Sequence, residues 1–119
     1  MAMIKLRRAY EAKACGDGFR ILVDRLWPRG LTKDKAGIDE WPKEVSPSTA
    51  LRQWFSHDPA RWREFKKRYF QELEAREEAV SRLAEKARQG TVTFVYGAKD
   101  SLHNNAAALK EYIEKRWPK

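Results

Sequence analysis

Two short polar clusters hold most of the side chains with which this chain could do chemistry. The first cluster, residues 24–30 (DRLWPRG), lies at the end of the apolar run 19–24, and the second, residues 99–105 (KDSLHNN), follows the apolar run 91–96. Both runs are typical of buried strands. In an open parallel sheet, ligands bind outside the carboxyl ends of the strands. If the two strands are neighbours, the two clusters border one crevice.

The residue types in this predicted crevice suit a phosphate or a carboxylate. Arginine offers a planar fork of N–H donors, and a helix beginning near residue 104 would add free N–H groups and a partial positive charge. We predict that ligand contacts come from Arg25, Arg29, Tyr96, Lys99 and Asn104. If the protein is an enzyme, Asp24 or Asp100 is the predicted general base.

The same residues also have a purely structural interpretation, because buried charges are usually paired. Asp24 would then pair with Arg25 or Lys99. The last helix would be capped by Ser101 or Asn104, and the remaining arginine of the first cluster would hold its own loop. Residue spacing alone leaves both interpretations open.

Other chemistries have weaker support in the sequence. His57 stands beside Asp58, but adjacent residues rarely orient one another as base and partner, and Asp58 precedes Pro59 as a helix N-cap. Cys15 lies in a turn-like stretch and is interpreted as an incidental loop thiol. One cysteine and two histidines cannot complete a four-ligand zinc site without carboxylates. No phosphate loop or dinucleotide-binding glycine pattern occurs, and we predict no metal and no cofactor.

The elements that would position the two clusters are strands followed by helices. Strands are predicted at 3–10, 19–24 and 91–96, and helices at 49–55, from Asp58-Pro59 to Gly90, and from about Asn104 onward. The helix of about 30 residues is expected to be kinked or split near residues 74–78, and residues 31–48 form a long irregular connection. A helical crossover between the last two strands implies parallel pairing. We predict one α/β domain over residues 1–119, a small three-layer fold with a short, mainly parallel sheet flanked by helices.

The composition suggests two alternative functions. The 119 residues carry 25 Lys and Arg against 17 Asp and Glu, a net charge of +8. One alternative is a nucleic-acid-binding or regulatory protein. The nucleic acid would contact one helix face, although glutamates lie on the same helix; that face holds Arg61, Arg63, Lys66, Lys67 and Arg68. The second alternative function is a protein-interaction module that uses the five tryptophans and the 31–48 loop. No apolar run is long enough for a membrane span or a signal region, so we expect a cytoplasmic protein without a membrane partner.

Residues 21–30 (ILVDRLWPRG) resemble the YeaO-like family, part of the domain of unknown function 488. Further similar stretches follow in order at 41–48 (WPKEVSPS), 51–59 (LRQWFSHDP), 65–69 (FKKRY) and 91–100 (TVTFVYGAKD), ending near residue 104. The resemblance implies a small α/β domain in the bacterial cytoplasm, with no established activity or catalytic set. More distant branches of the wider family carry a Cys-His-Arg stretch where this chain has Asn104-Asn105-Ala106. The resemblance therefore does not extend thiolate or metal chemistry to this chain.

Overall fold

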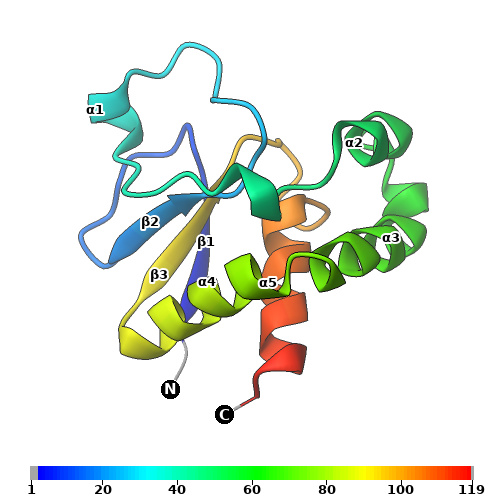
Figure 1. Cartoon of the computed structure of the whole chain (residues 1–119). Coiled ribbons are helices and arrows are strands. Elements are labelled where there is room, and N and C mark those ends of the chain that lie inside the picture. The colour runs from blue at the N-terminus through cyan, green and yellow to red at the C-terminus, as the bar shows by residue number, and fades with distance from the viewer. Residues whose placement is uncertain (1–2, 119) are drawn as a thin grey trace.

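The fold is built on a three-stranded parallel sheet in a computed structural model that describes residues 3–118. The strands are β1 (Ile4–Arg8), β2 (Phe19–Leu22) and β3 (Val92–Tyr96), in the spatial order β1-β3-β2 (Figure 1). All five residues of the central strand β3 are buried, as expected for a parallel strand covered on both faces. The predicted parallel pairing of the second and third strands is confirmed, and the carboxyl ends of all three strands lie at one edge of the sheet.

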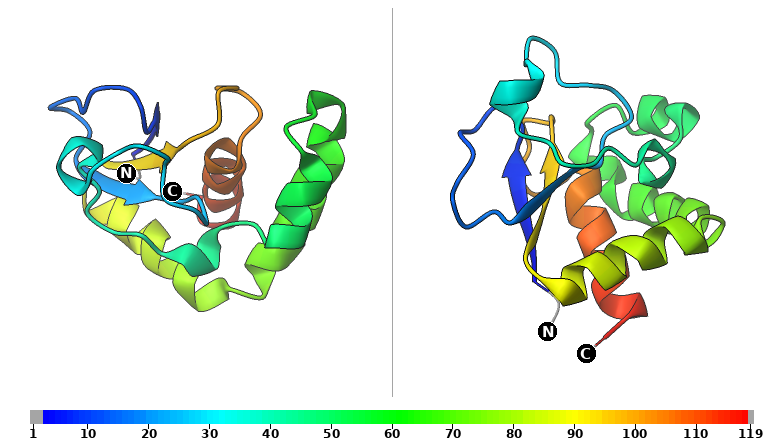
Figure 2. Two further views of the ribbon diagram at one scale, coloured as in Figure 1. Left: turned by 90° about the horizontal axis from the view of Figure 1, so that it is seen from above. Right: turned by 60° about the vertical axis from the view of Figure 1, so that its left-hand side comes forward.

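The helices surround this sheet and connect its strands. They are α1 (Lys33–Ala36), α2 (Thr49–Phe55), α3 (Trp62–Glu74), α4 (Glu77–Gln89) and α5 (Asn105–Arg116), with 3-10 turns η1 (Lys43–Val45) and η2 (Pro59–Arg61). The long helix predicted after Asp58 is split at Ala75 and Arg76, within the region expected to break. Figure 2 shows α3 and α4 diverging from this point.

Three predicted helix starts are confirmed by capping hydrogen bonds. Ser48 Oγ accepts from the Leu51 N–H at 3.1 Å, and an oxygen of Asp58 accepts from Ala60 at 3.0 Å with Pro59 at the first position of the turn. Asn104 Oδ1 accepts from the N–H three residues later at 2.8 Å. These caps satisfy N–H groups that a helix start otherwise leaves without a partner.

The two faces of the sheet are covered differently. One face packs through Ile21 and Phe94 against α3, α4 and α5, in the main hydrophobic cluster. The opposite face places Leu22 and Val95 beneath Trp27 and other apolar residues of the 27–41 segment. Helices were expected on both sides, but on this second side the cover is a loop with the one-turn helix α1. Among residues 3–118, no helix is long and apolar enough to cross a membrane.

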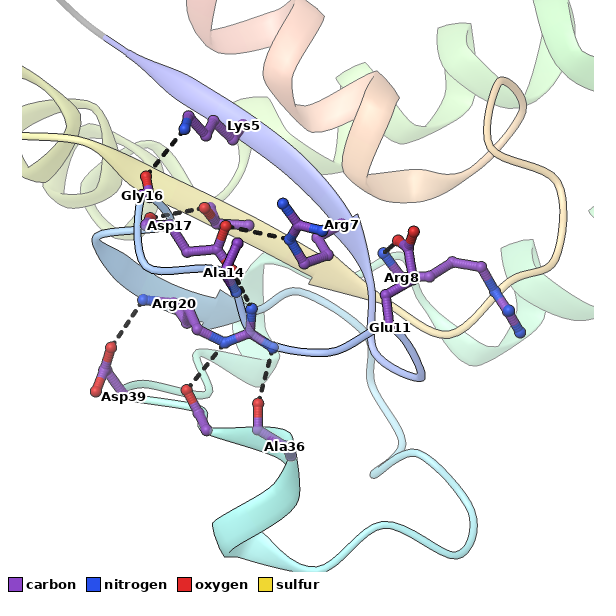
Figure 3. Close-up of polar contacts among 12 residues, drawn as sticks. Lys5, Arg7, Arg8, Glu11, Ala14, Gly16, Asp17, Arg20, Ala36 and Asp39 are labelled. Carbon is purple, nitrogen blue, oxygen red and sulfur yellow. Dashed lines mark hydrogen bonds and ion pairs between the residues drawn. The ribbon is translucent and has the colours of Figure 1, made fainter.

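A buried ion-pair cluster fastens the loops to the second face. Arg20 and Asp17 are both fully buried and form an ion pair with each other (Figure 3). The Arg20 guanidinium also donates to the carbonyl oxygens of Ala36 at 2.8 Å and Gly37 at 3.1 Å, while Arg7 Nε lies 3.1 Å from Asp17 Oδ1. Burial acts to raise the pKa of Asp17, but the Ala14 N–H and the two arginines outweigh it and hold that pKa below its ordinary value. The cluster therefore joins both edge strands to the loop layer.

Candidate functional site

A cavity of about 760 Å³ opens at the carboxyl ends of β2 and β3. Its walls come from segments that are far apart in sequence: residues 24–29 after β2, residues 97–98 after β3, residues 52–57 at the end of α2, and residues 103–105 at the start of α5. This is the edge at which open parallel sheets bind their ligands. The first of the two polar clusters supplies one wall, and the last three residues of the second supply another.

Three arginines line the cavity. Arg25 Nε donates to the carbonyl oxygen of Pro47 at 3.1 Å, which fixes the orientation of its guanidinium. Arg29 is exposed and Arg52 is half-buried. Within residues 3–118, none of the three guanidiniums has a carboxylate within 4.0 Å. Their positive charge is thus available to an incoming anion.

Asp24 is the single carboxylate among the described residues that line the cavity. It pairs with neither Arg25 nor Lys99; instead its Oδ2 accepts the Gly97 N–H at 2.8 Å. A Cβ at position 97 would stand 3.2 Å from that oxygen, so glycine allows the close approach. Burial raises the pKa of Asp24, and the Gly97 N–H, the side chain of Asn105 and nearby positive charge offset only part of this effect. Asp24 is therefore a poorly solvated hydrogen-bond acceptor.

The first turn of α5 forms one wall of the cavity. Asn104 is 2% exposed, caps the helix as described above, and donates from its own amide to the Asp100 carbonyl at 3.0 Å. Asn105 donates to the carbonyl oxygen of Val23 at 2.8 Å, which ties the helix start to the end of β2. The positive end of the helix dipole thus lies at the cavity. The predicted capping role of Asn104 is confirmed, and the same residue lines the cavity.

His103 lines the cavity, whereas Asp100 contacts His103 and is not among the lining residues. One oxygen of Asp100 accepts from the N–H groups of Leu102 at 2.9 Å and His103 at 3.0 Å, and the other lies 2.8 Å from His103 Nδ1. These hydrogen bonds, first that from Leu102, lower the pKa of Asp100. The His103 ring also packs edge-on against Trp62 at a centroid distance of 5.4 Å. Asp100 therefore acts on the cavity only through the ring that it orients.

The structure brings together four of the seven residues predicted for the site: Asp24, Arg25, Arg29 and Asn104. Tyr96 is 3% exposed and points into the main hydrophobic cluster, because alternate side chains of a strand face opposite sides of the sheet. Lys99 is exposed and, like Asp100, is not among the lining residues. On the β3 side, the cavity is therefore lined by fewer of the predicted residues than expected.

Arg52 and His57 reach the cavity without having been predicted as ligand contacts. The end of α2 carries them there, through a turn in which Ser56 and His57 both have positive φ, 47° and 56°. Non-glycine residues in this region cost conformational energy and cluster at functional sites. Arg52 carries no local signal, because its helix lies far in sequence from both polar clusters. Among the described residues, no group of three or more His, Cys, Asp and Glu is placed to hold a metal ion.

A three-stranded parallel sheet with an arginine-lined cavity at its strand ends defines a small α/β protein. The chain belongs to the domain of unknown function 488: the family model described as "Inactive DUF488-N3 subclade" matches residues 3–119. This confirms the resemblance found in the motifs. The uncharacterized protein YeaO of Escherichia coli is 40% identical over 110 residues, which cover 92% of this chain and 96% of the relative.

A second relative comes from a distant bacterium. The uncharacterized protein Rv3073c of Mycobacterium tuberculosis is 36% identical over 113 residues, which cover 95% of each chain. No solved structure matches the chain. The relatives establish the family, and their names assign no ligand or reaction.

Proposed function

We propose that the cavity binds a small molecule that bears a phosphate or carboxylate group. The observation that carries the proposal is the convergence of the Arg25, Arg29 and Arg52 guanidiniums on one cavity; within residues 3–118 they have no carboxylate partner and the cavity has one acidic side chain. Arginine is well suited to this role because its rigid fork binds two oxygens of an anion at once. The start of α5 adds a partial positive charge of the same sign.

The dimensions and the order of the cavity also suit a small ligand. A volume of about 760 Å³ falls within the roughly 300–1,000 Å³ typical of small-molecule sites. Arg25 is held by the Pro47 carbonyl, so less side-chain entropy is lost when it binds. A cytoplasmic location, which stays a prediction, would bring the cavity into contact with phosphorylated metabolites.

The proposal is one of binding and includes no reaction. The matching subclade is described as inactive. Both oxygens of Asp100 accept hydrogen bonds from its own loop, and Oδ2 of Asp24 accepts from Gly97. These contacts favour a role for both carboxylates as fixed hydrogen-bond acceptors over a role as a general base.

Thermal-shift and calorimetric titrations with phosphorylated and carboxylated metabolites test the proposal. We expect at least one anion to raise the melting temperature above that in sodium chloride of equal ionic strength. Arg52→Gln should weaken its binding by about tenfold or more, because a charge-assisted hydrogen bond is worth about 1.5–3 kcal/mol. Arg63→Gln, which changes an exposed arginine outside the cavity, is the matched control. If no anion stabilises the protein, or if both variants bind alike, the proposal is wrong.

The basic residues of η2 and α3 give no comparable support for nucleic-acid binding. Three of these five cations are already paired: Arg61 lies 3.7 Å from Asp58, Arg68 lies 2.9 Å from Glu64, and Lys66 lies 3.1 Å from Glu111. Paired cations release few counterions on contact with a phosphate backbone. We therefore propose no second function.

A further inference from the structure

We propose that the ligand is a mononucleotide, with its phosphate at the cavity arginines and its base between the ring side chains, where Asp24 accepts an N–H of the base. The inference rests on the proposed anion binding and specifies what the anion is attached to. It is carried by two observations that anion binding leaves unexplained: the ring-bearing side chains of the cavity wall, and a carboxylate inside an otherwise cationic cavity.

Five of the lining residues carry aromatic rings: Trp27, Phe55, His57, Phe65 and His103. Phe55 and Phe65 are only 5% and 2% exposed, while the other three are more exposed to the cavity and solvent. Flat aromatic surfaces bind planar heterocycles by stacking, whichever base is present. A sugar phosphate or an aliphatic acid has no group of matching shape.

Two of the wall rings are held in fixed orientations before any ligand enters. Trp27 Nε1 donates to the Leu31 carbonyl at 2.7 Å, and its ring packs against Trp41 at a centroid distance of 5.4 Å. His103 is held by Asp100 and by Trp62 in the same manner. A preorganised surface loses little entropy on binding, and this increases the affinity for a rigid partner.

Asp24 supplies the complementary hydrogen-bond acceptor. A carboxylate offers about four lone-pair sites; the Gly97 N–H at 2.8 Å occupies one of them, and the side chain of Asn105 lies beside it. Adenine, guanine and cytosine each carry an exocyclic amine, and carboxylates accept hydrogen bonds from such amines. A ligand without a donor would displace water from the half-buried Asp24 carboxylate and supply no hydrogen bond in its place, so Asp24 favours ligands that donate.

The test compares AMP, GMP and CMP with ribose 5-phosphate and inorganic phosphate by calorimetry on the intact protein. We expect the best nucleotide to bind about tenfold more tightly than ribose 5-phosphate, within the range for a base stacked on an aromatic side chain. Asp24→Asn and Trp27→Leu should each reduce this ratio of nucleotide affinity to ribose 5-phosphate affinity. The asparagine retains an acceptor for Gly97, and Asp34→Asn and Trp117→Leu, outside the cavity, are matched controls.

The outcomes separate this inference from the proposal beneath it. If ribose 5-phosphate binds as tightly as every nucleotide, the inference is overturned while anion binding stands. If the ratio is unchanged in a folded Asp24→Asn or Trp27→Leu variant, the contact of the base with that residue is overturned. If none of the five probes binds, both the inference and the proposed function fail for phosphates. A melting curve of each variant shows whether it is folded, and either variant alone suffices to test the ratio.

Discussion

Replacing Arg20 by methionine should cost about 4 kcal/mol of unfolding free energy. The substitution keeps an unbranched side chain but removes a guanidinium that is fully buried. It leaves the carbonyl oxygens of Ala36 and Gly37 without their donor and deprives Asp17 of its closest cation. Removing one partner of a buried ion pair typically costs about 3–5 kcal/mol, and we take the middle of that range because Arg7 still faces Asp17.

Urea unfolding at pH 7, followed by circular dichroism, measures this loss. Arg7→Met should cost about 1 kcal/mol, because the Arg7 side chain is 27% exposed and water can replace part of its contact. It also keeps the prediction testable if Arg20→Met does not fold. A loss below about 1 kcal/mol for Arg20→Met would refute the reasoning, since Arg20 would then matter no more than the part-exposed Arg7. The exposed Arg63→Met is the control, with an expected change within about 0.5 kcal/mol.

Two further predictions concern the cavity carboxylate and the turns. Because the pKa of Asp24 is raised, the folded protein binds a proton on this carboxyl more tightly than the unfolded chain does. The contribution of Asp24 to the free energy of unfolding therefore falls as pH rises from 3.8 through the raised pKa. Asp24→Asn should remove this loss. Urea unfolding should then show that the free energy of unfolding of the variant, relative to that of the parent protein, is higher at pH 7 than at pH 3.5; an equal difference at both pH values would contradict this. Gly18→Ala should cost about 3 kcal/mol, because φ is 66° and the new Cβ would overlap the carbonyl of Thr91. Gly30→Ala should cost only about 1 kcal/mol in the same assay, since φ is 83° but no atom lies within 4 Å; equal losses would show that the overlap is relieved.

The strands, the helix starts and part of the site could be predicted because their signals are local. The apolar runs ending near Asp24 and Tyr96 give β2 and β3. Ser48 and Asn104 cap their helices with their own side chains, a property of a few consecutive residues. The placement of Asp24 at a strand end follows from the same local pattern, and this is why the sequence could assign it to the site.

The break between α3 and α4 could not be placed to the residue. The apolar positions Leu73 and Val80 are seven apart, a spacing that also fits one continuous helix, and neither Ala75 nor Arg76 is a helix breaker. The two helices pack against different neighbours, α3 against α2 and α5, and α4 against η1. Tertiary packing therefore selects the point at which the helix ends.

Local sequence patterns predict the α/β class, the parallel pairing and the acidic and basic residues that follow the strands. The position of α2 beside these acidic and basic residues depends on packing between distant segments. The Ser48 N–H and hydroxyl donate to Glu72 at 2.8 and 2.6 Å, and the Tyr69 hydroxyl donates to the Val45 carbonyl. These contacts join residues 24 positions apart and bring Arg52 and His57 to the cavity. A capping residue or a strand end is decided by its chain neighbours, whereas a cavity wall is decided by packing between segments whose separation in sequence carries no periodic signal.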